Sequence, residues 1–223
     1  MLVLHGEDLA SVGRIELRND ADNVRVDAQR RRVLVGYGKG ALAVIDPATR
    51  TKIAEIPLKG HPESFQIDET GTQVFVNVPD AREIEVVDLA AEGSQSWPTQ
   101  GAQSNFPMAI DGEAHRVLVA FRNPPTLIAF SSQDGHTIAK PEICGDADDV
   151  FVDARRRRVY VSCGEGVVDV LEQDGVGYRR VAQVPTVPGA RTSLFVPEMD
   201  RLFVAVRAER SEPAAIWVFH PAL

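Results

Sequence analysis

The feature that most constrains the fold is an internal repeat. Residues 20–40 match residues 146–166 at 14 of 21 positions. Each copy of the repeat joins two apolar segments by a polar turn, which Asp opens in four of the five copies, and this pattern predicts a hairpin. Successive copies begin 41 to 44 residues apart, at 26–35, 67–76, 110–119, 152–161 and 196–204.

A third apolar segment follows each hairpin, and a fourth follows in the first four copies. Four antiparallel strands in a period of about 42 residues are typical of a β-propeller blade. Helices are not expected, because β-branched residues dominate the apolar positions and turn residues recur about every eight to twelve places. The sequence therefore predicts an all-β protein, a β-propeller of four-stranded antiparallel blades, about five of which are present.

The repeat also predicts the boundaries of the blades within a single propeller domain, residues 1–223. An N-terminal segment would supply two outer strands of an incomplete blade, and the last copy stops after its third strand. With these two N-terminal strands, the chain has one strand more than a closed five-bladed ring needs. We therefore expect the chain to be part of a longer propeller. The predicted segments are 1–19 for the N-terminal incomplete blade, 20–60, 61–103, 104–145 and 146–189 for the complete blades, and 190–223 for the C-terminal incomplete blade.

Charge and hydropathy exclude two classes of partner. The chain has 24 Lys and Arg against 32 Asp and Glu, a formal charge of −8, which repels nucleic acid. No apolar run approaches the roughly 20 residues of a membrane-spanning helix. The first ten residues lack the features of a signal peptide, so the residues themselves do not predict a location.

Two segments resemble a known family. The stretches VYVSCGEGVVDV (159–170) and VLVGYGKGALAVIDPATRTKIAEIPLKGHPES (33–64) are similar to the bacterial YVTN-type β-propeller repeat proteins, also called surface-layer-like or YncE-like. The literal Tyr-Val-Thr-Asn is absent, and Tyr160 to Cys163 is the nearest match. The resemblance implies seven blades, two of them outside this sequence, and an exported, extracytoplasmic or periplasmic protein. It implies a fold far more than a function.

The loops of a blade alternate between the two ends of its strands. The arginine runs 30–32 and 155–158 fall in first hairpin turns, whereas the acidic segment 145–149 leads into the first strand of a blade. We therefore expect the arginines to be solvated turn residues, at the end opposite the acidic segment.

The loops that lead into first strands, here called the entering loops, are expected to meet at the mouth of a central channel. They carry ten candidate ligand-binding residues, Asp20, Asp22, Asn23, His61, Glu63, Asn105, Asp146, Asp148, Asp149 and Arg191.

Two interpretations of these residues stay open. Short polar side chains at such positions often bond their own backbone in Asx-turns. Alternatively, their oxygens form a ligand site or a calcium-type site, to which His61 adds a nitrogen or a general base. Five further residues of the loops between second and third strands are expected around the same mouth, namely Tyr37, Lys39, Arg82, Arg122 and Arg207.

No nucleophile or zinc motif occurs in the chain. Cys144 and Cys163 are expected near one another, either as a disulfide or as buried thiols. The leading hypothesis is a non-catalytic scaffold that binds a protein or a small polar ligand without a cofactor. The alternatives are a hydrolase similar to lactonase propellers, with a divalent cation at the channel mouth, and an accessory protein to a redox enzyme.

Overall fold

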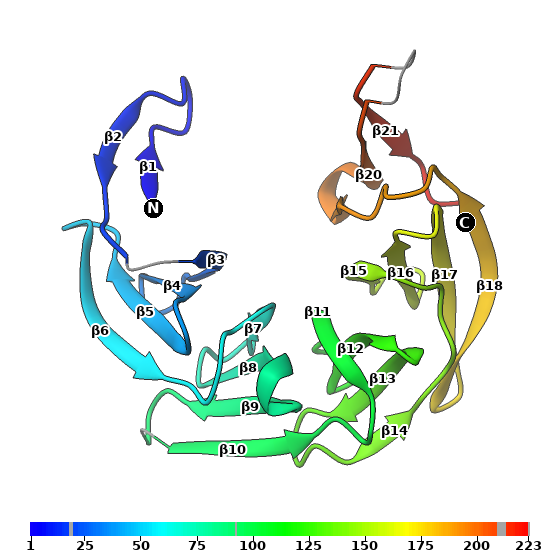
Figure 1. Ribbon diagram of the computed structural model, residues 1–223, viewed down its shortest axis with the longest axis horizontal. Coiled ribbons are helices and arrows are strands. Elements are labelled where there is room, and N and C mark those ends of the chain that lie inside the picture. Colours follow the sequence, from blue (N-terminus) through cyan, green and yellow to red (C-terminus); the bar gives the residue numbers. More distant parts are fainter. Residues whose placement is uncertain (18–19, 92, 209–212, 223) are drawn as a thin grey trace. The chain divides into compact units, whose positions relative to one another are not determined.

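The computed structural model describes the chain except residues 18–19, 92, 209–212 and 223. The first predicted entering loop, 18–23, thus lies partly outside the described residues. The chain divides into two compact units, Met1–Thr99 and Gln100–Leu223. Described residues fold into β-strands with two one-turn 3₁₀ helices (Figure 1), and none of these helices is long and apolar enough to cross a membrane.

Unit 1, Met1–Thr99, contains three antiparallel sheets whose strands pair in chain order, β1–β2, β3–β6 and β7–β10. Its elements are β1 (Leu2–Leu4), β2 (Ser11–Arg14), β3 (Ala21–Asp27), β4 (Arg32–Tyr37), β5 (Ala41–Asp46), β6 (Thr51–Pro57), β7 (Phe65–Ile67), β8 (Gln73–Val78), the 3₁₀ helix η1 (Pro79–Ala81), β9 (Glu83–Asp88) and β10 (Gly93–Pro98).

Unit 2, Gln100–Leu223, contains two four-stranded sheets, β11–β14 and β15–β18, and the three-stranded sheet β19–β21. Its elements are β11 (Gln103–Asp111), β12 (Arg116–Asn123), β13 (Pro125–Ser131), β14 (Thr137–Ala139), β15 (Ala147–Asp153), β16 (Arg158–Cys163), β17 (Val167–Asp174), β18 (Gly177–Pro185), β19 (Ser193–Val196), the 3₁₀ helix η2 (Pro197–Met199), β20 (Arg201–Val206) and β21 (Ala215–Phe219).

The apolar core of each unit lies between consecutive sheets, as expected for blades that pack face to face. In unit 1, Leu34 and Leu42 of one sheet meet Phe65 and Val76 of the next. In unit 2 the strands β11 and β15 touch, as do β15 and β19. Both faces of the middle strands are therefore apolar, which explains the dense Val, Leu and Ile of the repeat. The predicted all-β fold of four-stranded antiparallel sheets is confirmed.

The Asp that opens each predicted hairpin turn has a local role. Its side chain accepts a backbone N–H from a residue three to five places later in the turns of Asp27, Asp68, Asp111 and Asp153. Such Asx-turns fix the geometry of the turn with one short side chain. The repeated Asp is thus explained by the turn.

The arginine runs differ from the prediction of solvated turns. Arg155 and Arg157 are exposed, but the side chain of Arg156 is only 6% exposed. Its guanidinium lies 2.9 Å from Asp153 and 2.7 Å from Asp200, in the hairpin turn of the following sheet. Arg156 therefore clamps two neighbouring turns together. The solvated interpretation is wrong for this residue and for Arg32, whose side chain is 17% exposed and lies 3.0 Å from Asp27.

Unit 1 has a similar clamp at the duplicated position. Arg30 Nη1 donates to the carbonyl oxygens of Thr70 and Gly71, at 3.1 and 2.5 Å, in the turn of the next sheet. Its own backbone N–H binds Asp27. The Asp-x-x-Arg spacing therefore provides a turn cap and a contact between sheets.

Candidate functional site

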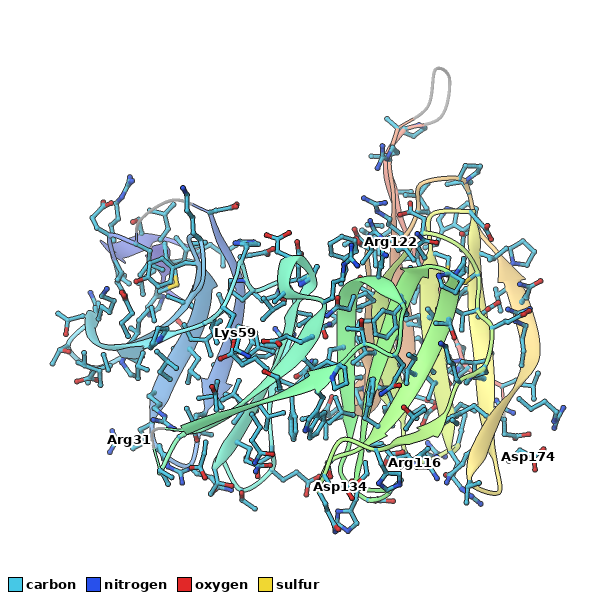
Figure 2. The ribbon with its side chains drawn as sticks, turned by 60° about the horizontal axis from the view of Figure 1, so that its bottom comes forward. Arg31, Lys59, Arg116, Arg122, Asp134 and Asp174 are labelled. Atoms are coloured by element: carbon cyan, nitrogen blue, oxygen red, sulfur yellow. A yellow bond between two sulfur atoms is a disulfide. The ribbon has the colours of Figure 1, made fainter. Side chains whose placement is uncertain are left out.

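The entering loops of unit 2 lie at the end of the strands opposite the hairpin turns. Figure 2 shows Arg122 at one end of this unit and Arg116, Asp134 and Asp174 at the other. Arg116 begins β12 after the first hairpin turn, and Asp134 follows β13, whereas Arg122 lies near the far end of β12. The alternation of loops expected from the sequence holds within this unit.

Four charged side chains form the centre of the site, which we call the Arg–Asp cluster: Arg122, Asp146, Asp148 and Arg191. Arg122 lies 3.2 Å from Asp146 and 2.5 Å from Asp148. Arg191 lies 2.5 Å from Asp146 and 3.5 Å from Asp148. Each carboxylate thus contacts both guanidiniums, which offset the repulsion between the two acids.

The electrostatics of the cluster follow from this pairing. Hydrogen bonding to Asp146 raises the pKa of Arg191, so its guanidinium stays charged. Two carboxylates and two guanidiniums leave no net charge. The side chains are between 23% and 40% exposed, so solvent and ligands reach their outer atoms.

Backbone geometry holds the cluster in place. Asp146 has a left-handed φ of 58°, and a Cβ at Gly164 would lie 2.0 Å from its carboxylate, so this approach requires glycine. Gly164 N–H donates to Asp146 O at 2.9 Å. Arg122 Nε donates to Ala147 O at 2.9 Å, and the guanidinium lies 4.3 Å from the centre of the Phe106 ring. These contacts fix the positions of the Asp146 carboxylate and the Arg122 guanidinium.

A disulfide lies directly beneath these loops. Cys144 precedes the acidic loop, Cys163 ends β16, and their sulfur atoms are bonded. Both residues are buried. Of the two alternatives left open by the sequence, the structure contains the disulfide.

The other two candidates of unit 2 have structural contacts. Asp149 accepts the backbone N–H of Ser193 at 2.6 Å, and Ser193 Oγ lies 2.7 Å from Ser162 Oγ, so this group connects two sheets. Asn105 is fully buried in β11, opposite Phe121. Its side chain is not at the surface with the Arg–Asp cluster.

In unit 1 the candidates bind mainly backbone. His61 Nδ1 lies 2.6 Å from Gly38 O and 3.8 Å from the exposed carboxylate of Asp20. Asn23 Nδ2 donates to Glu63 O at 3.1 Å. Asp22 is exposed. These contacts join the loop before β7 to β3, to Asp20 just before β3, and to the loop between β4 and β5.

The structure also corrects the expected rim of the site. Tyr37 is 3% exposed, and its hydroxyl donates to Glu55 on β6, so its ring belongs to the core. Lys39, Arg82 and Arg207 are exposed. No sequence motif marks Phe106 or Ser193, because their roles depend on the distant partners Arg122 and Asp149.

Metal ligands are not grouped in the part of the chain that the structure describes. Within those residues, no set of three or more His, Cys, Asp or Glu side chains is arranged to hold a metal ion. The acidic residues of the Arg–Asp cluster bind guanidiniums instead.

Comparisons with known proteins show the fold. No protein-family model and no curated protein sequence matches the chain. Hydrazine synthase of Kuenenia stuttgartiensis is similar at 13% identity, with a TM-score of 0.82 over 99% of this chain and 77% of that one. The Cps50 (Swd1) β-propeller domain of Myceliophteria thermophila is similar at 8% identity, with a TM-score of 0.81 over 98% of this chain and 76% of that domain.

A functionally unknown protein of Desulfotomaculum acetoxidans DSM 771 is similar at 16% identity, with a TM-score of 0.76 over 97% of this chain and 80% of that one. At these identities the likeness concerns the fold alone. Together with the repeated antiparallel sheets, it defines the chain as a β-propeller protein, a fold that hosts many unrelated functions.

Proposed function

We propose that this β-propeller is a non-catalytic binding scaffold that captures a peptide segment of a protein, or a small polar ligand, at the Arg–Asp cluster. The observation that supports the proposal is the placement of four partly exposed charged groups in loops and at strand ends, next to a disulfide and backbone hydrogen bonds. Binding residues commonly lie on loops that a rigid scaffold positions.

The chemistry of the cluster indicates the class of ligand. A guanidinium has five N–H donors and a carboxylate has two acceptor oxygens, so both kinds of group retain capacity beyond their mutual bonds. The cluster has no net charge, which disfavours a simple anion or cation. A peptide backbone, or a zwitterion, offers donors and acceptors together and matches this surface.

No resident metal ion is part of the proposal. A calcium-assisted hydrolase would need the acidic oxygens of Asp146 and Asp148 as ligands, and in this structure both accept guanidinium donors. Catalysis and a redox partnership have no specific observation in their favour, so neither is proposed.

A peptide selection tests the proposal. Phage-displayed random dodecapeptides are panned against the immobilised full chain, and enriched peptides are measured by calorimetry. We expect binding to weaken about tenfold in the variant Arg122→Gln/Asp148→Asn, since charged hydrogen-bonding pairs contribute about 1.5 to 3 kcal/mol. The matched control Arg155→Gln/Asp174→Asn changes exposed charges at the opposite end of unit 2 and should bind as the parent does.

Two results would contradict the proposal. One is the absence of any enriched peptide whose binding responds to the cluster variant. The other is a melting temperature raised by calcium in the parent and unaffected by calcium in Asp146→Asn, which would favour the metal-assisted hydrolase.

We also propose membership of the bacterial YVTN-type, surface-layer-like family, with seven blades and a location outside the cytoplasm. The segments 33–64 and 159–170 support the family, and the Cys144–Cys163 disulfide supports an oxidising compartment. Sequencing the coding region on both sides tests the blade number. Two further repeats of about 42 residues are expected, and their absence would refute the seven-bladed proposal.

A further inference from the structure

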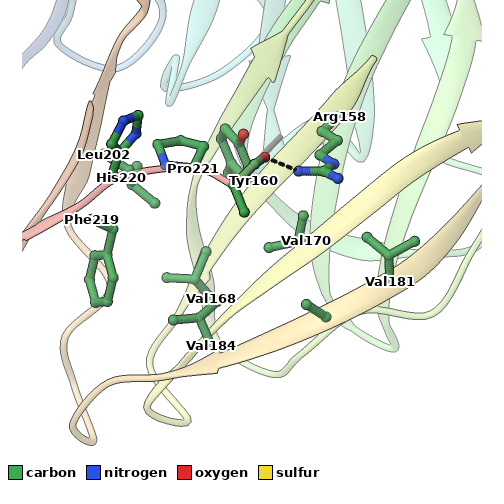
Figure 3. Close-up of a pocket in the computed structure, with 12 residues that line it drawn as sticks. Arg158, Tyr160, Val168, Val170, Val181, Val184, Leu202, Phe219, His220 and Pro221 are labelled. Atoms are coloured by element: carbon green, nitrogen blue, oxygen red, sulfur yellow. Dashed lines mark hydrogen bonds between the residues drawn. The ribbon is translucent and has the colours of Figure 1, made fainter. Parts of the chain in front are cut away.

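One buried acid of unit 2 lies in a place that the sheet alone does not explain. Asp169, the third residue of β17, is fully buried. Its neighbours Val168 and Val170 line an apolar groove on one face of the sheet β15–β18 (Figure 3). Because side chains alternate along a strand, Asp169 points to the other face, where its cross-strand neighbour Val161 belongs to the apolar core. A carboxylate buried there costs free energy unless hydrogen-bond donors compensate it.

Three residues donate hydrogen bonds to this carboxylate. Arg180 and Gln183, both on β18, each lie 2.9 Å from it. The third donor is the backbone N–H of Cys144, 2.8 Å from Asp169 Oδ2. Arg180 Nη2 also donates to Glu142 O at 3.2 Å. The buried ion pair therefore holds the chain at two points directly before the acidic segment 145–149, which carries the two acids of the Arg–Asp cluster.

Cys144 transmits this anchoring to the cluster. Its side chain is bonded to Cys163 and its N–H to Asp169, so two separate contacts fix its backbone. Asp146 follows two positions later, and the N–H of Gly164, next to Cys163, donates to Asp146 O. The direction in which the chain leaves Cys144 therefore determines where the carboxylates of the Arg–Asp cluster lie.

The repeat offers an internal comparison. Asp169 lies opposite the fourth residue of β16, a valine, and Glu85 lies opposite the fourth residue of β8, also a valine. Glu85 is 2% exposed, and its carboxylate accepts the N–H of Lys59 at 3.1 Å. Like Cys144, Lys59 stands directly before a glycine at the start of an entering loop. The two units thus each contain a buried acid that binds the same backbone position of the repeat.

The other sheets show that the third strand does not need an acid at this position. In the sheets β3–β6, β11–β14 and β19–β21, the equivalent residues also lie opposite valines and are uncharged, namely Ala43, Ile128 and Trp217. The carboxylate of Asp169 is therefore explained by the loop that it binds rather than by the packing of the sheet.

We propose that Asp169 is a positioning residue of the ligand site: its bond to Cys144 N–H fixes the acidic loop so that Asp146 and Asp148 each meet both guanidiniums. Asp169 itself contacts no ligand. A loop held in its binding conformation loses little conformational freedom when a ligand binds, so the affinity of the site depends on this buried acid. The inference rests on the proposed function of the Arg–Asp cluster.

Three variants isolate the bond to Cys144. Asp169→Leu removes the acceptor and fills the space, as Ile128 does at the equivalent position, while the two donors on β18 are exposed enough to turn toward solvent. Asp169→Asn retains the size and one acceptor oxygen. The matched control is Glu85→Leu, the same kind of change at the equivalent position of unit 1. Asp169→Val takes the place of Asp169→Leu if the latter does not fold.

Hydrogen exchange without any ligand measures the position of the loop. The amide N–H of Gly164 and the Nε–H of Arg122 both donate to carbonyl oxygens of the acidic loop. In Asp169→Leu we expect both groups to exchange about tenfold faster, the effect of losing one charged hydrogen bond that holds the loop.

Two controls separate positioning from general stability. Exchange of both groups should be unchanged in Asp169→Asn and in Glu85→Leu. The amide of Gly135 donates to Ser131 O at the opposite end of unit 2. A variant that only lowers the stability of the unit would speed exchange at Gly135 as well, whereas Asp169→Leu should leave it unchanged.

The dodecapeptide selected on the parent tests the role in binding. Asp169→Leu should weaken its binding about tenfold, and the other two variants should bind it as the parent does. Parent-like exchange of Gly164 and Arg122 in Asp169→Leu, or equal acceleration at Gly135, would overturn the proposal. Faster exchange with unchanged peptide binding would overturn it too, because the position of the loop would then not determine affinity. If panning selects no peptide, the proposed function fails, and the exchange data alone decide whether Asp169 positions the loop.

Discussion

The disulfide beneath the Arg–Asp cluster gives the sharpest stability prediction. It joins Cys144 to Cys163, which are 19 positions apart, across the hairpin formed by β15 and β16. Closing a loop of this length lowers the entropy of the unfolded chain and stabilises the folded state by about 3 kcal/mol. For a chain of this size, that corresponds to about 6 to 12 °C in melting temperature.

The assay compares thermal melts of the parent with those of Cys144→Ala/Cys163→Ala, followed by circular dichroism. The double variant should melt about 6 to 12 °C lower. Reductant should lower the melting temperature of the parent and leave the double variant unchanged. Removing two buried sulfur atoms also leaves a small cavity, which costs further stability. A fall in melting temperature larger than the predicted range would therefore still agree with the prediction.

Two observations would refute this reasoning. The first is two reactive thiols in the denatured, unreduced parent, which would show that the disulfide does not form. The second is an equal melting temperature for parent and double variant with the disulfide demonstrated by mass spectrometry. That result would mean that the unfolded chain is already restricted near this hairpin.

Three further predictions concern ion pairs. Hydrogen bonds from Arg156 lower the pKa of Asp200 below its ordinary value of 3.8. The ionised Asp200 carboxylate therefore stabilises the folded state above about pH 4, and this contribution is lost as the pH falls through the folded-state pKa. Acid melts of Arg156→Met should therefore fall less steeply than those of the parent, and equal slopes would contradict the clamp. At neutral pH, Arg156→Met should lower the urea midpoint more than Arg30→Met, since these side chains are 6% and 37% exposed, and the reverse order would argue against burial as the cause. Asp169→Ala removes a fully buried carboxylate that pairs with Arg180 and should cost about 3 kcal/mol in urea unfolding, whereas a cost below about 1 kcal/mol would mean that the pair adds little.

The fold was predictable because its information is local. The period of about 42 residues, the β-branched apolar segments and the Asp that caps each turn all lie within one repeat. The burial of Arg156 was not predictable in the same way, because its partner Asp200 lies 44 positions away. Tyr37 was misplaced for a related reason, since its partner Glu55 is on the outer strand of the same sheet.

The candidate site was predictable only in part. Alternation of loops placed the acidic segment of 145–149 and Arg122 at one end of the strands. Their pairing depends on packing between sheets, since Arg122 and Asp148 are 26 positions apart. Asn105 shows that polarity alone does not identify a ligand-binding residue at the surface. This polar residue lies in the first strand of its sheet and is buried as completely as a core valine.

The pairing of every described strand with its neighbours in the chain has a consequence for how the protein forms during synthesis. Each sheet needs only short loops to close, and short loops close quickly and at small entropic cost. A nascent chain can therefore complete one sheet soon after the residues of that sheet have emerged from the ribosome, before the residues of the next sheet have been translated. The packing partner of each sheet arrives one repeat later, so its apolar face is exposed for about the time needed to translate 42 residues, roughly 2 to 8 seconds at 5 to 20 residues per second.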